Sequence, residues 1–305
     1  MKPLRSRVAA AAAAILLSTN SPALAHGWAG QRFFPATILT DDPFVADEIS
    51  LPQISVNPPG PDGSRETDIQ IDLSKRITPD IGVIIGYQWQ HLQPQDQPAV
   101  TGFGPLSTEA QYQLFINGPH EALGLVGLNV TWAHTGRVQA LGAPDFTTLS
   151  PTFNFGKGFG DLPRSLPYIR PFAITGNLGF DFPTKTESAG EPNPDAFNYG
   201  FAFEYSLPYL QCCVKDIGLR APFSQLIPLV EVAFTTPINR LTPGVTTTGT
   251  IQPGIIWAGQ YFQIGAEAIL PVNHATGHGF GGVFQLHFYL DDLFPRSIGR
   301  PISEW

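Results

Sequence analysis

Short segments in which every second residue is apolar recur along the chain, and this period of two constrains the fold more than any other feature. The segment from Phe197 to Leu207 is the clearest, because five aromatic residues and a leucine alternate with Asn, Gly, Ala, Glu and Ser. Successive side chains of a β-strand point to opposite faces, so all the aromatic rings of this segment lie on one side. The pattern predicts strands with one apolar and one polar face.

Twelve such segments follow one another, with connections that are in large part alternately short and long. The segments are 48–56, 66–76, 80–91, 107–116, 121–132, 146–156, 168–181, 197–207, 227–236, 246–258, 261–270 and 280–290. The short links are Ile77–Pro79, Asn117–His120 and Gly259–Gln260, and the long loops are Leu92–Leu106, Ala133–Asp145, Pro183–Ala196 and Pro271–Gly279. Bacterial membrane barrels have an even number of strands, with short turns at one end and long loops at the other. We therefore predict an all-β fold, a transmembrane antiparallel up-and-down β-barrel of about 12 strands.

Two connections break this alternation. Lys157–Pro167 and Pro208–Leu226 are long, although they fall on the side of the short turns. The second has the length for a short helix. A miscount of one strand pair also explains both connections, so a barrel of ten strands is the alternative.

The polar faces of the segments separate a membrane barrel from a secreted β-sandwich. A soluble sandwich wets its polar face and normally covers it with Lys, Arg and Glu. Here those faces carry mostly Gly, Gln, Asn and Thr, and charged residues make up only 14% of the chain. Aromatic residues at strand ends, such as Trp89, Trp132 and Trp257, suit the interfacial girdles of a membrane barrel. The membrane barrel is favoured.

The start of the chain has the form of an export signal. Lys2, Arg5 and Arg7 precede an apolar run from Val8 to Leu17, and small residues end the segment at Ala25. A membrane-spanning helix needs about twenty apolar residues, which is more than this run offers. We predict a cleaved signal peptide over residues 1–25.

The remainder divides into three parts. Residues 26–47 are predicted to be an irregular leader, 48–290 the barrel, and 291–305 a C-terminal periplasmic tail. Export without a later apolar run of about eighteen residues predicts the cell outer membrane as the location. The net charge is −8, and without the signal 14 basic residues face 25 acidic ones, a net charge of −11. This balance argues against nucleic-acid binding.

Cys212 and Cys213 are the two cysteines of the chain, and they are adjacent. No disulfide framework can be built from them. A vicinal disulfide departs from ordinary disulfide geometry, so two half-buried thiols are the favoured reading.

Carboxylates and amides gather on the face assigned to the lumen, with almost no Lys or Arg beside them. The predicted lumen-lining residues are Asp68, Asp72, Glu109, Gln111, Glu121, Glu204, Glu231, Gln263, Glu267, Gln285 and His287. Such a lining attracts cations. The competing reading pairs these carboxylates with arginines such as Arg32 and Arg137, which would plug the lumen. The leader 26–47 is long enough to enter the lumen.

No motif requires an active site, a cofactor or a metal ion. His274 and His278 have a spacing that suits a helix face, but the surrounding NHATGHG predicts a loop, which disfavours a metal site. His287 is the one histidine placed in the lumen, and the chain has no G-x-S-x-G nucleophile motif. The sequence therefore does not predict an enzyme.

Three stretches carry a resemblance to known barrels: LSPTFNFGKGFGDLPRSLPYIRPFAITGNLGF, EYSLPYLQCCVKDIGLRAPFSQLIPLVEVAF and TGTIQPGIIWAGQYFQIGAEAILPVN. They resemble uncharacterised proteobacterial, and hence Gram-negative, outer-membrane β-barrels of the transporter type, and are broadly similar to the family named after the phenol-degradation meta pathway. The resemblance implies an outer-membrane location and uptake of small, aromatic or hydrophobic compounds. It implies no catalytic residue.

Together these features predict a porin-like, passive channel or transporter for small molecules with an acidic, Gln-rich lumen. A non-conducting structural or surface-binding barrel is the alternative, and a lipid-acting enzyme is a third. The expected partners are outer-membrane lipid, a small solute and the barrel assembly machinery. We expect a monomer. The solute, and whether the lumen is open or plugged, do not follow from the sequence.

Overall fold

A computed structural model describes residues 27–136, 141 and 145–303. Twelve strands form the barrel wall, and all of them pair antiparallel with their neighbours. They are β3 (Glu48–Val56), β4 (Arg65–Arg76), β5 (Ile81–Gln93), β7 (Ser107–Asn117), β8 (Ala122–Thr131), β9 (Thr148–Gly158), β10 (Phe172–Pro183), β13 (Ala196–Tyr205), β14 (Leu226–Pro237), β15 (Thr248–Ala258), β16 (Phe262–Pro271) and β17 (Gly281–Tyr289).

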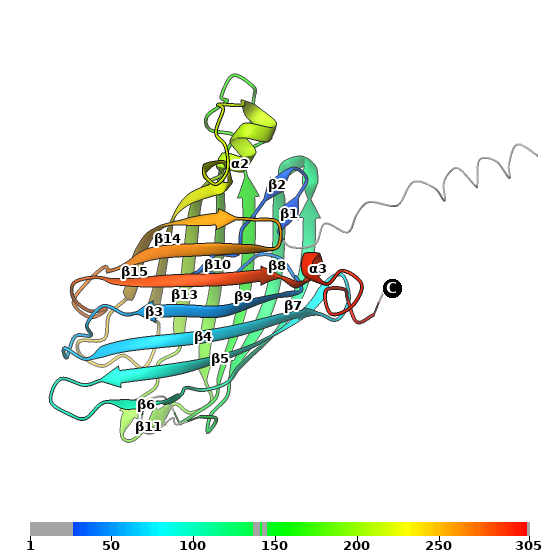
Figure 1. The fold of residues 1–305 in the computed structure, drawn as a ribbon. Coiled ribbons are helices and arrows are strands. Elements are labelled where there is room, and N and C mark those ends of the chain that lie inside the picture. Colours follow the sequence, from blue (N-terminus) through cyan, green and yellow to red (C-terminus); the bar gives the residue numbers. More distant parts are fainter. Residues whose placement is uncertain (1–26, 137–140, 142–144, 304–305) are drawn as a thin grey trace, which may run out of the picture.

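Each strand pairs with the next one along the chain, and β17 pairs with β3 to close the barrel (Figure 1). The predicted fold class and the count of twelve are therefore confirmed, and the alternative of ten strands is wrong. The predicted 48–56 coincides with β3, whereas the segment predicted from 168 begins at Phe172. Residues 168–171 turn instead, with the Phe172 amide bonded to the Ile169 carbonyl at 3.0 Å.

Smaller elements decorate the wall. They are the hairpin β1 (Trp28–Ala29) with β2 (Arg32–Phe33), β6 (Val100–Phe103), the hairpin β11 (Glu187–Ser188) with β12 (Glu191–Pro192), and the short helices η1 (Gly118–His120), α2 (Leu207–Tyr209), η2 (Leu210–Val214), η3 (Phe223–Gln225) and α3 (Leu290–Leu293). Among the described residues, no helix has the length and apolar character that crossing a membrane requires.

The two ends of the barrel differ. We call the end that carries η1, α2 and α3 the leader end, because the leader begins and ends there, and the end that carries β6 and β11 the loop end (Figure 1). The predicted short links lie at the leader end, and the four predicted long loops lie at the loop end. The two connections that break the alternation, between β9 and β10 and between β13 and β14, are long in the structure as well. The second one holds α2, η2 and η3, as its length suggested.

The two faces of the wall follow the period of two. On β17, Phe284 is 41% exposed, whereas its neighbour Gln285 is buried. The same alternation places Phe203 outside and Glu204 inside on β13. The outer surface is therefore apolar and the inner surface polar, which is the arrangement that lipid on one side and a polar interior on the other require.

The expectation of two thiols at Cys212 and Cys213 is wrong, because the two residues form a vicinal disulfide. Their Cα atoms are 3.7 Å apart, closer than in an ordinary disulfide. Both cysteines lie in η2, a π-helical turn directly after α2.

A charge on the outer face of β17 should destabilise the barrel according to its depth. Phe284→Arg places a cation near the middle of the strand and should lower the free energy of unfolding by about 2–4 kcal/mol, since this is the cost of Arg at the bilayer midplane. Phe280→Arg is the matched control at the loop-end rim, where the cost is about 0–1 kcal/mol. Urea unfolding in lipid vesicles measures both, and equal losses would contradict the assigned depth.

Candidate functional site

The leader, residues 27–47, runs inside the barrel. The β1–β2 hairpin lies near η1 at the leader end, and the chain then passes through the lumen and returns to the start of β3 (Figure 1). Phe34 and Phe44 are almost fully buried and pack with Leu123 and Ala173 of the wall. Deeper in the lumen, Ile38 packs with Ile269 and Val283. The leader is therefore packed against the wall through two apolar clusters.

Glu231 of β14 binds the innermost turn of the leader. Its carboxylate accepts hydrogen bonds from the backbone amides of Ile38 at 2.8 Å, Leu39 at 3.1 Å and Thr40 at 2.8 Å. The Thr40 hydroxyl donates a fourth at 2.9 Å. Glu231 is fully buried. A carboxylate with several amide donors is well satisfied, so this group holds the leader in place.

Two glutamines of the wall bind the leader backbone in the same way. Gln263 donates from Nε2 to the Ala36 carbonyl at 2.5 Å and accepts from the Ala36 amide at 3.2 Å. Gln113 accepts from the Val45 amide at 3.0 Å and donates to the Pro43 carbonyl at 3.1 Å. An amide side chain offers both a donor and an acceptor, so it replaces the partner strand that an irregular backbone lacks.

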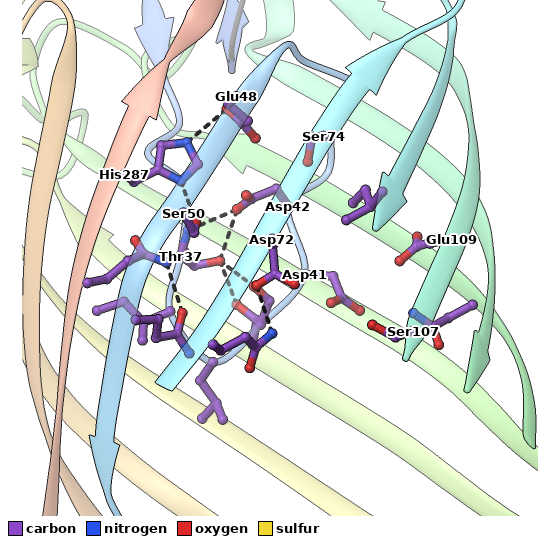
Figure 2. A pocket seen from close by; sticks show the side chains of 18 of the residues that line it. Thr37, Asp41, Asp42, Glu48, Ser50, Asp72, Ser74, Ser107, Glu109 and His287 are labelled. Carbon is purple, nitrogen blue, oxygen red and sulfur yellow. Dashed lines mark hydrogen bonds and ion pairs between the residues drawn. The ribbon is translucent and has the colours of Figure 1, made fainter. Parts of the chain in front are cut away.

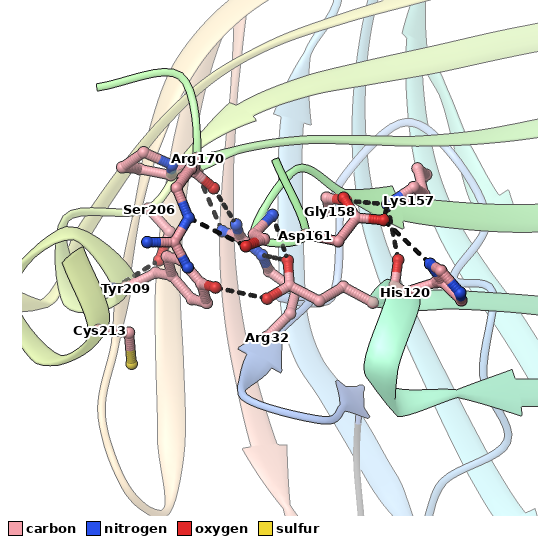
Figure 3. Close-up of polar contacts among 12 residues, drawn as sticks. Arg32, His120, Lys157, Gly158, Asp161, Arg170, Ser206, Tyr209 and Cys213 are labelled. Carbon is pink, nitrogen blue, oxygen red and sulfur yellow. Dashed lines mark hydrogen bonds and ion pairs between the residues drawn. The ribbon is translucent and has the colours of Figure 1, made fainter. Parts of the chain in front are cut away.

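Arg32 of β2 anchors the start of the leader (Figure 3). Its Nε donates to Glu121 Oε2 at 3.2 Å, and its Nη1 and Nη2 donate to the carbonyls of Pro171 and Arg170 at 2.9 and 2.5 Å. The guanidinium carbon lies 3.7 Å from the centre of the Tyr209 ring. Arg32 is fully buried. We call Arg32 and these contacts the Arg32 clamp.

Tyr209 and Glu121 complete the clamp. The Tyr209 hydroxyl donates to Glu121 Oε1 at 2.5 Å, and the Gly160 amide donates to Oε2 at 2.9 Å. Burial, together with the hydrogen bond to Glu121, raises the pKa of Tyr209 to about 12. The hydroxyl therefore stays protonated and keeps donating at any physiological pH. The two unusually long connections at the leader end supply these groups, since Gly160 and Tyr209 belong to them.

Asp47 anchors the other end of the leader. Its carboxylate accepts from the Arg76 amide at 2.8 Å, from Arg76 Nε at 2.9 Å and from Lys75 Nζ at 2.5 Å. Asp47 is fully buried, and its carbonyl accepts from the Leu290 amide at 2.9 Å. The leader is thus fixed at both ends and in the middle.

Among the described residues, cavities of about 380, 330 and 230 Å³ lie beside the leader and towards the loop end. The largest lies between the leader turn Thr37–Asp42 and the wall, and its carboxylates include Asp41, Asp72 and Glu109 (Figure 2). The second reaches the loop that follows β3, and the third lies beside Asp181. Within the described part of the chain, no Lys or Arg lines any of the three.

Inward-facing glycines lie beside these carboxylates. Gly86 is the cross-strand partner of Asp72, and a Cβ there would collide with the Asp72 carboxylate. Gly127 is the cross-strand partner of Gln111, and a Cβ there would collide with the Glu109 carboxylate. Glycine therefore leaves room for each carboxylate along the wall.

The predicted lumen residues fall into three groups. Asp72, Glu109, Gln111, Gln285 and His287 line the largest cavity. Glu121, Glu231 and Gln263 bind the leader or its clamp. Asp68, Glu204 and Glu267 are buried but line none of the three cavities: Asp68 accepts from Asn57 at 2.7 Å, Glu204 accepts from Thr175 at 3.2 Å, and Glu267 lies against Gly254.

The competing reading, a lumen carboxylate paired with a leader arginine, is confirmed for Arg32 with Glu121. Arg137, the other arginine named for this role, lies outside the described residues. The sequence analysis does not identify three residues that bind the leader or its clamp, namely Asp47, Gln113 and Tyr209. Gln113 continues the alternation of Glu109 and Gln111, so the period of two was a signal for it. Asp47 and Tyr209 lie outside the strands, and their sequence carries no such signal.

His287 joins β17 to β3 through a polar trio. Its Nδ1 is 2.8 Å from Ser50 Oγ, and its Nε2 is 3.0 Å from Glu48 Oε2. This order of hydroxyl, imidazole and carboxylate is that of a serine-hydrolase triad. The cavity beside it, however, also contains Asp42 and Asp72, and negative charge there would oppose the oxyanion that acyl transfer develops. The surroundings favour a structural role for the trio.

Comparison with solved structures gives outer-membrane barrels. An outer-membrane channel from Pseudomonas putida F1 has a TM-score of 0.55 and 9% sequence identity, with 84% of this chain and 99% of that chain covered. The KdgM porin has a TM-score of 0.47 and 8% identity, covering 79% of this chain and 98% of its own. The NanC porin has a TM-score of 0.46 and 6% identity, covering 77% and 97%.

The similarity to the Pseudomonas putida channel shows the fold, that of a closed antiparallel β-barrel. No protein-family model matches the sequence, and no curated protein matches it. The narrower resemblance to the barrels of the phenol-degradation meta pathway stays a prediction.

Glu231→Gln should loosen the innermost turn of the leader. The amide has one acceptor oxygen, and its NH₂ group faces donors, so at least one leader amide loses a bond to a charged partner worth about 1.5–3 kcal/mol. Hydrogen exchange of the amides of Ile38, Leu39 and Thr40 should accelerate by about tenfold or more. Glu187→Gln, on the exposed hairpin β11, is the control. Unchanged exchange in Glu231→Gln would show that Glu231 does not hold the leader.

Proposed function

We propose that this chain is an outer-membrane barrel that acts as a passive channel for small solutes, with the leader as its constriction and a preference for cations. One observation carries the proposal: the three cavities that lie beside the leader and towards the loop end contain several carboxylates, and their described lining contains no Lys or Arg. Fixed negative charge in a low-dielectric lumen raises the local concentration of cations. The leader end then faces the periplasm, and the loop end faces outward.

The location and biogenesis follow from the same proposal. The apolar outer face and the fold of the Pseudomonas putida channel support insertion in the outer membrane. A signal peptide over residues 1–25 would direct export, the barrel assembly machinery would insert the chain, and the barrel would work as a monomer. No cofactor and no covalent step enter this mechanism.

The carboxylates that line the largest cavity should set ion selectivity. The double variant Asp72→Asn, Glu109→Gln removes two charges there and should shift the reversal potential in a salt gradient towards zero. Glu204 and Glu267 are also predicted from the sequence to line the lumen, but they line none of the three cavities, so their Gln variants should have a smaller effect. Asp216→Asn, exposed at the leader end, is the control. An unchanged reversal potential in the double variant would contradict the proposed lining.

Removal of the leader should widen the pore. Deletion of residues 28–44 takes away the packed segment, so the single-channel conductance in a planar bilayer should rise several-fold. Heat-modifiable migration in a gel verifies that the barrel is folded. Glu231→Gln, which keeps the leader but weakens its innermost contact, should give frequent steps to a larger conductance and serves if the deletion does not assemble. A folded deletion variant with unchanged conductance would show that the leader is not the constriction.

The runner-up is a non-conducting barrel with a structural or surface-binding role. The three sets of contacts that fix the leader, at Arg32, Glu231 and Asp47, favour this alternative. Silence of both the intact protein and the folded deletion variant would support it and overturn the channel.

A further inference from the structure

The loop between β16 and β17 contains two histidines that face each other. His274 and His278 are exposed at the loop end, with their Nδ1 atoms 3.1 Å apart and their ring centres 5.0 Å apart. Without a metal ion, the Nδ1–H of one ring donates to the Nδ1 lone pair of the other. Neither residue lines any of the three cavities.

A helical turn in the loop precedes the second histidine. The Gly277 amide donates to the Asn273 carbonyl at 3.2 Å, an i to i+4 bond, and the Thr276 amide donates to Asn273 Oδ1 at 3.0 Å. His278 lies just past this turn, after Gly277, whose φ of +148° redirects the chain. The segment NHATGHG is a loop, as predicted, and its path after the turn brings the two Nδ1 atoms together.

The turn is also fixed to its surroundings. Asn273 Nδ2 donates to the Thr247 carbonyl at 2.8 Å, and the His278 amide donates to the Pro59 carbonyl at 2.8 Å. These bonds tie the turn to two other loops of the barrel. A pair of ligands held in place loses little entropy when it binds an ion, which favours binding.

The separation of the two Nδ1 atoms matches that of two ligands on one metal ion. With metal–nitrogen bonds of about 2.0–2.1 Å, two adjacent ligating nitrogen atoms lie about 2.9 Å apart in square-planar geometry and about 3.3 Å apart in tetrahedral geometry. The observed 3.1 Å falls between these values. Neutral imidazole nitrogen suits Zn²⁺, Cu²⁺ and Ni²⁺, whereas Mg²⁺ and Ca²⁺ prefer oxygen.

We propose that His274 and His278 bind one first-row divalent transition-metal ion, with Zn²⁺ as the representative, through their Nδ1 atoms. The ion replaces the proton between the rings, and that proton moves to the exposed Nε2 of the same ring. Water fills the remaining coordination positions, so the ion exchanges readily. The site lies at the loop end, where Thr276 of the same turn lines the cavity that contains Glu66. It does not depend on whether the barrel conducts.

Calorimetric titration of the tag-free, folded full-length protein with ZnCl₂ tests the site. A large excess of MgCl₂ occupies the carboxylates of the lumen, so the imidazole pair should remain as a single Zn²⁺ step of one ion per chain. Because the outer-shell partners of a metal site alone are worth about 10–100-fold in affinity, His274→Gln and His278→Gln should each weaken this step by at least about tenfold. His120→Gln, an exposed histidine at the leader end, should leave it unchanged.

Electron paramagnetic resonance of the protein with one equivalent of Cu²⁺ provides a second readout. The spectrum should show two equatorial nitrogens, and one fewer in either single variant. Absence of a magnesium-resistant step in the intact protein would mean that the rings share a hydrogen bond only, and would overturn the proposal. A step that persists in the folded double variant His274→Gln, His278→Gln would also overturn the proposal, because the ion would then bind elsewhere.

Discussion

The irregular backbone of the leader needs a hydrogen-bond partner for its polar groups at membrane depth, and much of the lumen is arranged around that need. Non-helical backbone is tolerated there only where it is buried in protein or lines a water-filled cavity. Gln263 and Gln113 provide paired amide contacts, and Glu231 accepts from three consecutive amides. The sequence predicts a Gln-rich pore lining. In the structure, some of the lumen glutamines instead complete the hydrogen bonds of the leader backbone.

The acidic residues of the lumen consequently have two kinds of role. Glu121 is paired with Arg32 and Glu231 is hydrogen-bonded by the leader, and neither lines the three cavities. Asp72 and Glu109 line open volume, and no described Lys or Arg lines that volume with them. The second set, together with Asp41 and the other carboxylates of the cavities, is therefore in direct contact with the open volume. A count of lumen carboxylates from the sequence overstates the charge that a solute meets.

The wall could be predicted from the sequence because lipid on one side and a polar interior on the other impose a period of two on every strand. For that reason the number of wall strands from β3 to β17, and the approximate positions of their ends, could be predicted. The sequence indicated Arg32 as a partner for lumen carboxylates, but not which groups it contacts, because those groups lie 89 and more residues away and meet it only after the barrel closes. Two local features could not be predicted either: the disulfide of Cys212 and Cys213, and the close approach of His274 and His278. Both depend on the path of one short turn or loop, which the neighbouring residues do not predict.

Inner-face glycines connect the shape of the lumen with its charge. Gly86 and Gly127 lie where a Cβ would collide with the carboxylates of Asp72 and Glu109. A larger residue at either position would push the carboxylate away from the wall and into the cavity, and so would change the free volume and the position of the charge at once. Under the proposed function, pore width and ion preference are therefore not independent properties of this barrel. The same strand pairs determine both. The glycines of the polar faces therefore have a role apart from turns, which is to leave space for the carboxylates.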